Sequence, residues 1–143
     1  MTIPIPSPCR IRHLDLPPLA GPPGPLHTVL EDIQGNIYYS DEIHHSVVSL
    51  NHRGELRWHC GTKGSEPSQF RYPQGMSLGW IHHDGSPQRC IAISDSWNRR
   101  IQFLSLDGQY LLSWSRGGDT PFSEVADIRF IPGVLIAQEI SHH

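Results

Sequence analysis

Residues 61–118 read GTKGSEPSQFRYPQGMSLGWIHHDGSPQRCIAISDSWNRRIQFLSLDGQYLLSWSRGG and decide the fold class. An apolar run follows Gly75, and three more lie at 90–94, 101–106 and 110–114. Each run is short and closes at Gly, Asp or Asn, the residues that favour turns. Within the third run apolar and polar residues alternate, which suits a strand with two unequal faces. The stretch therefore predicts four consecutive short β-strands.

The composition of the whole chain agrees with an all-β protein of one domain. It has 143 residues, enough for a single core, and 13 Gly and 13 Pro divide it into pieces too short for long helices. A net charge of −3 gives no electrostatic reason to expect nucleic acid or an anionic membrane as partner. The sequence has no membrane-spanning apolar run and no signal-peptide pattern at its start, and its 3 cysteines do not form a disulfide framework. We predict a cytoplasmic protein without a cofactor.

Residues 1–25 form a separate proline-rich lead-in. Proline has no amide donor, so a segment of this kind is expected to be irregular, with one edge strand conceivable at 9–14. The folded domain is expected to span residues 26–143.

An internal repeat organises this domain. Residues after Leu26 follow the same order of four short runs, and the two stretches superimpose without gaps at an offset of 54. The matched pairs are Ile37 with Ile91, Ser40 with Ser94, Asp41 with Asp95, Val47 with Ile101, Leu50 with Leu104, and Gly54 with Gly108. An incomplete third copy places Phe122 on Phe70 and residues 134–139 on 90–95. The predicted units are 26–60, 70–116 and an incomplete 122–143, the middle one with an insertion near 81–88.

The middle copy resembles the NHL repeat, the unit of a β-propeller family. The resemblance rests on Gln69-Phe70, Pro73, Gly75, Asp95, Asn98, Arg100-Ile101 and Asp107-Gly108, in the order and spacing of that repeat. In the first copy His44 and Ser46 stand where the repeat has Asn and Arg, and in the third copy Asp127 replaces the Gly and Glu139 the Asp. The resemblance implies a partial propeller of four-stranded antiparallel blades.

The same resemblance implies that the repeat positions stabilise the fold and take no part in catalysis. We expect Asp95 to accept hydrogen bonds from the turn amides that follow its strand, and Arg100 to pair with an acid. The positions assigned to the repeat framework are Asp41, Asp95, Asn98, Arg100, Pro73, Gly75, Gly54 and Gly108.

The number of repeats is small for such a fold. Propellers of this family close with about six blades, whereas this chain offers about two and a half. Open strand edges and apolar faces would then need either missing blades or self-association to cover them. The chain is therefore interpreted as a fragment of a larger propeller, as a subunit whose oligomer completes the ring, or as a truncated gene product.

Ten histidines, with adjacent pairs at 44–45, 82–83 and 142–143, raise the alternative of a metal site. Zinc would need three or four converging ligands, and adjacent histidines in a turn diverge. The repeat register also places the pair at 82–83 at the opposite end of the strands from the pair at 44–45. No ligand set can be assigned from the sequence, so a metal-dependent propeller lyase or hydrolase stays an alternative.

Trp97 is the residue best placed for recognition, because it lies in a turn beside Asn98 and Arg99. With His44 and His45 in the matching turn of the first copy, these residues form a candidate partner-binding face. The predicted function is a non-enzymatic scaffold that binds protein. RNA binding through the same loops is a second alternative, which the acidic net charge disfavours.

Overall fold

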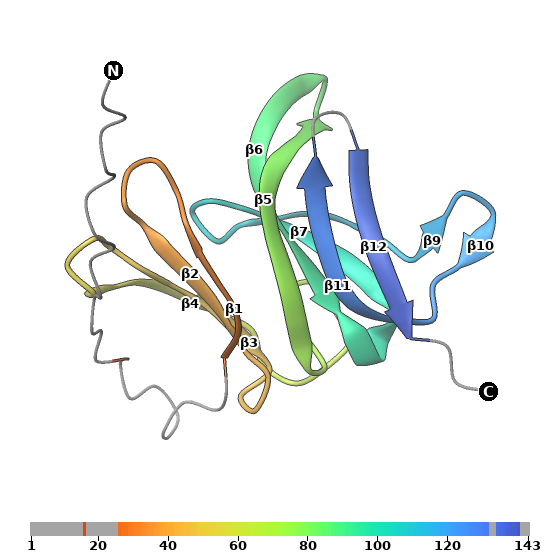
Figure 1. Cartoon of the computed structure of the whole chain (residues 1–143), viewed down its shortest axis with the longest axis horizontal. Helices are drawn as coiled ribbons and strands as arrows, with labels where there is room; N and C mark the ends of the chain where they lie inside the picture. Colours follow the sequence, from red (N-terminus) through yellow and green to blue (C-terminus); the bar gives the residue numbers. More distant parts are fainter. Residues whose placement is uncertain (1–15, 17–25, 132–133, 141–143) are drawn as a thin grey trace, which may run out of the picture.

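The computed structural model describes Leu16, residues 26–131 and residues 134–140, and these are arranged as antiparallel strands (Figure 1). The first sheet has the order β1 (Leu26–Glu31), β2 (Ile37–Asp41), β3 (Ser46–Leu50) and β4 (Leu56–Cys60). The second sheet has the order β5 (Pro73–His83), β6 (Ser86–Asp95), β7 (Arg100–Ser105) and β8 (Tyr110–Trp114), with the short 3-10 helix η1 (Ser96–Asn98) between β6 and β7. A small hairpin, β9 (Arg116–Gly117) and β10 (Thr120–Pro121), leads to a last hairpin of β11 (Glu124–Ile131) and β12 (Val134–Ile140).

The all-β prediction is confirmed for the described residues, which contain no α-helix. The predicted proline-rich lead-in, with its conceivable strand at 9–14, lies outside the described residues except for Leu16. That residue packs on the outer face of the first sheet, against Ile37, Tyr39, Val48 and Leu50. No helix in the described part of the chain is long and apolar enough to cross a membrane.

The second to fourth strands of the first two sheets correspond residue for residue at the offset of 54, but the first strands do not, since Glu31 pairs with Ile37 as Leu78 pairs with Ile91. The expected superposition without gaps is therefore wrong for β1 and β5, which the insertion at 81–88 shifts. Ile37 pairs with Leu50 in the first sheet as Ile91 pairs with Leu104 in the second. The turn glycines also correspond, since Gly54 has φ +83° and Gly108 has φ +84°. Both positions lie in the left-handed region, where glycine has no Cβ to clash.

The insertion at 81–88 lengthens one hairpin. β5 and β6 stay paired from Leu78 with Ile91 out to His83 with Ser86, past the point where the shorter β1–β2 hairpin turns. The repeat register predicts that His82 and His83 lie in the turn before the second strand, but they end β5 and pair with Pro87 and Ser86, and the turn itself is Asp84 and Gly85.

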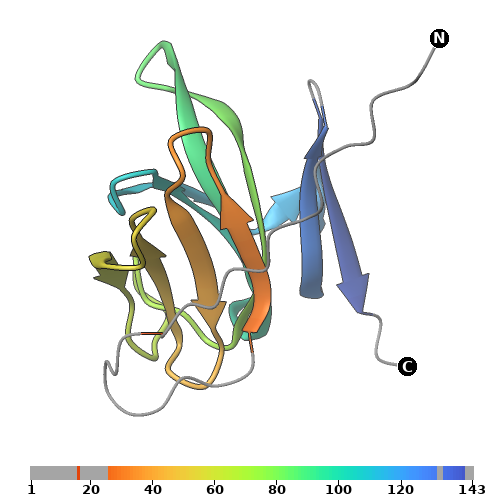
Figure 2. The same cartoon turned by 60° about the vertical axis from the view of Figure 1, so that its left-hand side comes forward.

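The second sheet is packed on both faces (Figures 1 and 2). One face contributes Ile91, Ile93 and Leu104 to a core shared with Tyr38 and Val47 of the first sheet. The opposite face contributes Cys90, Ala92 and Phe103 to a core shared with the β11–β12 hairpin. The backbone of β5 lies close to both neighbours, to β1 of the first sheet and to β11 of the last hairpin.

Two glycines let β11 approach β5 closely. A Cβ built on Gly75 would lie 2.8 Å from the Cα of Asp127, and one built on Gly79 would lie 2.3 Å from the ring of Phe130. A side chain at either position would push the hairpin away from the second sheet. The glycine of the Pro73-x-Gly75 motif therefore serves the contact between neighbouring sheets.

Candidate functional site

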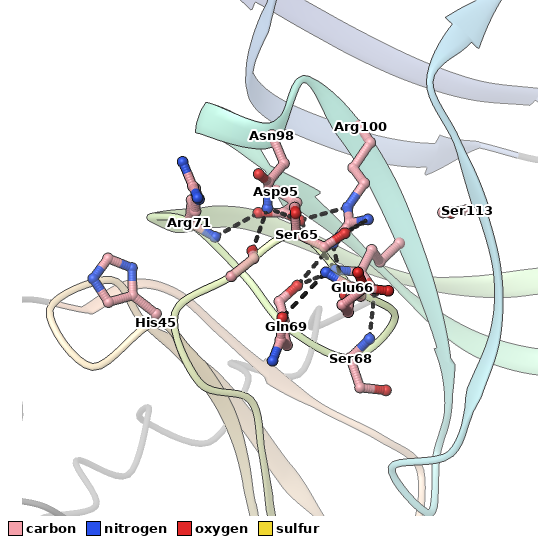
Figure 3. A network of polar contacts seen from close by, with 12 residues as sticks. His45, Ser65, Glu66, Ser68, Gln69, Arg71, Asp95, Asn98, Arg100 and Ser113 are labelled. Carbon is pink, nitrogen blue, oxygen red and sulfur yellow. Dashed lines mark hydrogen bonds and ion pairs between the residues drawn. The ribbon is translucent and has the colours of Figure 1, made fainter.

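The carboxylate of Asp95 is the centre of a polar network at one end of the second sheet (Figure 3). Asp95 is completely buried, so its charge must be met by protein donors. Its oxygens accept hydrogen bonds from the Arg71 backbone N–H at 2.7 Å, Asn98 Nδ2 at 2.9 Å, Arg100 Nε at 2.7 Å and Gln102 Nε2 at 3.0 Å. Four donors on one carboxylate fix the turn after β6 rigidly.

The same network holds the loop between the two sheets. Arg100 donates through Nη1 to the carbonyl of Ser65 at 2.7 Å, and through Nη2 to the carbonyls of Glu66 at 3.0 Å and Gln69 at 2.9 Å. Asn98 Nδ2 adds a bond to the carbonyl of Gly64 at 2.8 Å. The expected pairing of Arg100 with an acid is seen here, and Arg100 also organises a loop backbone that lacks regular structure. The expectation that Asp95 binds the amides of the turn after its strand is wrong, because its carboxylate makes no cap bond to η1 and takes its backbone donor from Arg71, in the loop before β5.

In the first sheet the side chain of His44 binds the aspartate at the end of β2, as the side chain of Asn98 binds the aspartate at the end of β6. The Nδ1 atom of His44 lies 2.7 Å from Oδ2 of Asp41, and the His44 backbone N–H donates to Oδ1 at 3.1 Å. A carboxylate can only accept, so this ring nitrogen carries the proton. The apparent departure from the repeat at residue 44 is thus a different side chain making an equivalent bond.

Three aromatic rings form a row where the loops of the two sheets meet. The ring of His45 meets Tyr72 edge-on with centroids 4.6 Å apart, and Tyr72 lies against Trp97 at 4.5 Å. The Tyr72 backbone N–H donates to Nδ1 of His45 at 3.0 Å, and the Trp97 backbone N–H donates to the carbonyl of Arg71 at 3.2 Å. We call His45, Tyr72 and Trp97 the aromatic row.

The outer end of the row is open to solvent. Trp97 is 61% exposed, although it is a large apolar residue held in place by its neighbours. Around the row, Lys63, Arg71 and Arg99 are exposed cations. Burial, followed by the nearby Lys63 charge, lowers the pKa of His45 below its ordinary value. Exposed cations thus lie around the row although the chain as a whole carries a net charge of −3, and the carboxylates of Asp41 and Asp95 act on His45 from below.

The predicted partner-binding residues are only partly brought together. Trp97 and Arg99 are exposed, and His45 joins Trp97 through Tyr72. Asn98 and His44 have side chains occupied by the bonds to Asp95 and Asp41. Sequence reasoning missed Tyr72, whose contact with Trp97 depends on how the loop before β5 folds back, which no spacing in the sequence records.

The described residues contain no group of three His, Cys, Asp or Glu side chains placed to hold a metal ion. The pair at 142–143 lies outside these residues. Burial raises the pKa of the Cys90 thiol to about 12, and that of Cys60 is raised as well, again mainly by burial. Both thiols therefore remain protonated at neutral pH and are poor nucleophiles.

No family model matches the chain, and no curated protein matches it.

Proposed function

We propose that this chain is a segment of an NHL-type β-propeller that binds a protein partner at the aromatic row. The propeller assignment is supported by the two equivalent four-stranded sheets, by their face-to-face packing, and by β5 contacting both β1 and β11. In a propeller, neighbouring blades pack face to face and their innermost strands surround a common axis. The function is non-enzymatic and consists in presenting a rigid surface.

The observation that carries the binding proposal is the exposed Trp97 ring. Aromatic side chains that are large, held rigid and partly exposed dominate protein recognition, because they bury much apolar area at little entropic cost. On one side Trp97 packs against the ring of Tyr72. On the other side it is part of η1, which directly follows Asp95, the carboxylate that accepts four hydrogen bonds. No ordering of the loop is then needed when a partner binds.

The neighbouring charges indicate which partner chemistry fits. Lys63, Arg71 and Arg99 are exposed near the aromatic row. A peptide segment with a carboxylate beside an apolar or aromatic residue would place its ring on Trp97 and its charge among these cations. Because the cations lie at the rim, they affect the association rate and its salt dependence more than the final affinity.

The test first selects, from a displayed library, peptides that bind the immobilised full chain. The affinity of the selected peptides is then measured for wild type and for Trp97→Ala. Loss of a central aromatic residue in a binding site costs about 2 kcal/mol or more, so we expect a loss of roughly 30-fold. Trp80→Ala is the matched control, because Trp80 is also 61% exposed but lies in the lengthened β5–β6 hairpin.

Equal binding by wild type and Trp97→Ala would contradict the proposal. Single-stranded RNA measured in the same assay separates the second candidate. Tighter binding of RNA than of any selected peptide, with a steep fall at high salt, would assign the surface to nucleic acid instead.

A further inference from the structure

The outer face of the first sheet, which points away from the second sheet, is buried. Its side chains Ile37, Tyr39, Val48 and Leu50 are at most 5% exposed. Leu16 is the only described hydrophobic residue outside the sheet that packs against them. One leucine, itself only half-buried, is too small to cover four side chains that include a tyrosine. Further residues of the chain must therefore lie on this face.

The second sheet shows what such a face normally contacts. Three pairs of residues match at the offset of 54, namely Ile37 with Ile91, Tyr39 with Ile93, and Leu50 with Leu104. The three members in the second sheet pack on the first sheet, against Tyr38 and Val47. The outer face of the first sheet is thus the face on which a preceding sheet would pack, and the described residues contain no such sheet.

The first sheet lacks the two side chains that hold the preceding loop on the second sheet. Arg100 and Gln102 both donate to the carbonyl of Gln69, in the loop that leads into β5. At the offset of 54, Ser46 and Val48 stand at these two positions. The Ser46 hydroxyl is buried without a hydrogen-bond partner in the described part of the chain, and Val48 belongs to the apolar face. Whatever lies on the first sheet is therefore held by apolar contacts and not by bonds to its backbone carbonyls.

The cover on the first sheet is narrower than a sheet. Val29 of β1 pairs with Tyr39, as Met76 of β5 pairs with Ile93. Met76 is 3% exposed in the core between the two sheets, but Val29 is 56% exposed. At the other side of the first sheet, Leu56 of β4 is 48% exposed. Burial is confined to the two middle strands, β2 and β3, which suits a single extended segment.

We propose that the proline-rich lead-in, residues 1–25, covers this face in its own chain with Leu16 as the apolar anchor. Leu16 already lies on the face, so its neighbours in the chain are within reach of the other side chains. Proline-rich segments stay extended without internal hydrogen bonds and bind aromatic surfaces through apolar contacts. The Tyr39 hydroxyl is buried without a partner among the described residues, as expected under a cover whose prolines have no amide donor.

The lead-in thus takes the place of a preceding sheet. A second copy of the chain, or any other sheet, reaches this face only by displacing the lead-in. The proposal does not depend on the aromatic row, which lies in loops of the first and second sheets.

The test is hydroxyl-radical labelling of the full chain, read by mass spectrometry at Tyr38 and Tyr39. These adjacent residues lie on opposite faces of β2, Tyr38 in the core shared with the second sheet and Tyr39 on the outer face. In wild type we expect both to be protected relative to Tyr110, which is 36% exposed. Labelling of Tyr39 at the rate of Tyr110 in wild type would overturn the proposal without any variant.

Leu16→Asp shows whether the lead-in is the cover. We expect labelling of Tyr39 to rise severalfold, to at least the rate of Tyr110, while Tyr38 stays protected. Leu16→Met should keep Tyr39 protected. Ile33→Asp is the matched control, because Ile33 is 87% exposed in the β1–β2 turn, and it should leave both tyrosines unchanged. Continued protection of Tyr39 in Leu16→Asp would contradict the proposal.

Nuclear Overhauser effects in wild type decide the question if labelling of Tyr38 shows that Leu16→Asp has unfolded. We expect contacts between the Tyr39 ring and protons of residues 1–25 within one chain. In an equal mixture of isotope-labelled and unlabelled chains, contacts that arise only between different chains would assign the cover to a second copy. That result, or the absence of any contact, would overturn the proposal. Peptide binding at Trp97 is expected to be unchanged in Leu16→Asp, so failure of one proposal is distinguishable from failure of the other.

Discussion

Arg100 Nε donates a 2.7 Å hydrogen bond to Oδ2 of Asp95, and this ion pair joins the strand ends of the second sheet to the loop that connects it with the first. The side chain of Asp95 is 0% exposed and that of Arg100 is 14% exposed. The pair therefore lies where a charge without its partner would be costly.

Arg100→Met is expected to destabilise the fold by about 3 kcal/mol or more, because it leaves the buried Asp95 carboxylate without its cation. It also removes the donors to three loop carbonyls, those of Ser65, Glu66 and Gln69. Urea unfolding followed by circular dichroism measures the change. Arg99→Met is the control, since Arg99 is adjacent and exposed, and its effect should stay within about 0.5 kcal/mol. Equal effects of the two substitutions would contradict this account of the network.

His44→Ala is expected to lower stability by about 1–3 kcal/mol, because a hydrogen bond to the nearly buried Asp41 carboxylate is lost. His44→Asn should restore most of that loss, since Asn98 makes the equivalent bond to Asp95 in the second sheet. Thermal and urea unfolding of both variants check the expectation. If Asn were as destabilising as Ala, the two turns would not be equivalent.

Gly108→Ala is expected to be more destabilising than Gly85→Ala. Both glycines have positive φ, +84° and +80°, so each alanine suffers a backbone cost of about 1–2 kcal/mol. At Gly108 the new Cβ would also lie 2.8 Å from the Trp58 ring, whereas at Gly85 nothing lies within 4 Å. The clash adds about 1–3 kcal/mol, and unfolding free energies measure the difference. Trp58→Ala combined with Gly108→Ala should remove this extra cost, and its persistence would show that the clash is not the cause.

Stability is expected to fall as the pH drops below about 6.5, the ordinary pKa of histidine, because the pKa of His45 is lowered in the folded state. The unfolded chain then binds a proton that the folded chain does not, and this linkage favours unfolding until the pH reaches the folded pKa. His45→Asn should weaken the pH dependence. Asn does not titrate, keeps an acceptor for the Tyr72 N–H, and tolerates the φ of +51° at this position. Unfolding midpoints measured across this pH range test the expectation, and an unchanged slope in His45→Asn would contradict it.

Much of the fold could be predicted from local sequence signals. Short apolar runs closed by turn residues predict the strands, and the offset of 54 predicts the matching of Ile37 with Ile91 and of Gly54 with Gly108. These predictions hold because strand length and turn position depend on neighbouring residues. The insertion at 81–88 is visible in the sequence, but its result, a hairpin that stays paired from Leu78 to His83, depends on pairing across strands.

The candidate site was harder to predict, because its members come from loops of different sheets. Trp97 was identified from its turn and Arg100 from the repeat, whereas Tyr72 gave no signal. From the sequence, His44 is a departure from the repeat, because sequence comparison records the residue type and not the bond that the side chain can make.

The sequence by itself determined the strands, their turns and the repeated register, because these follow from side-chain alternation and from residues such as Gly108 that permit one backbone conformation. Only the tertiary structure decided which loops meet at Tyr72, how closely β11 approaches Gly75, and that β12 pairs with β11 alone among the described residues. Those outcomes depend on packing between sheets, where contact is set by shape in three dimensions and not by distance along the chain.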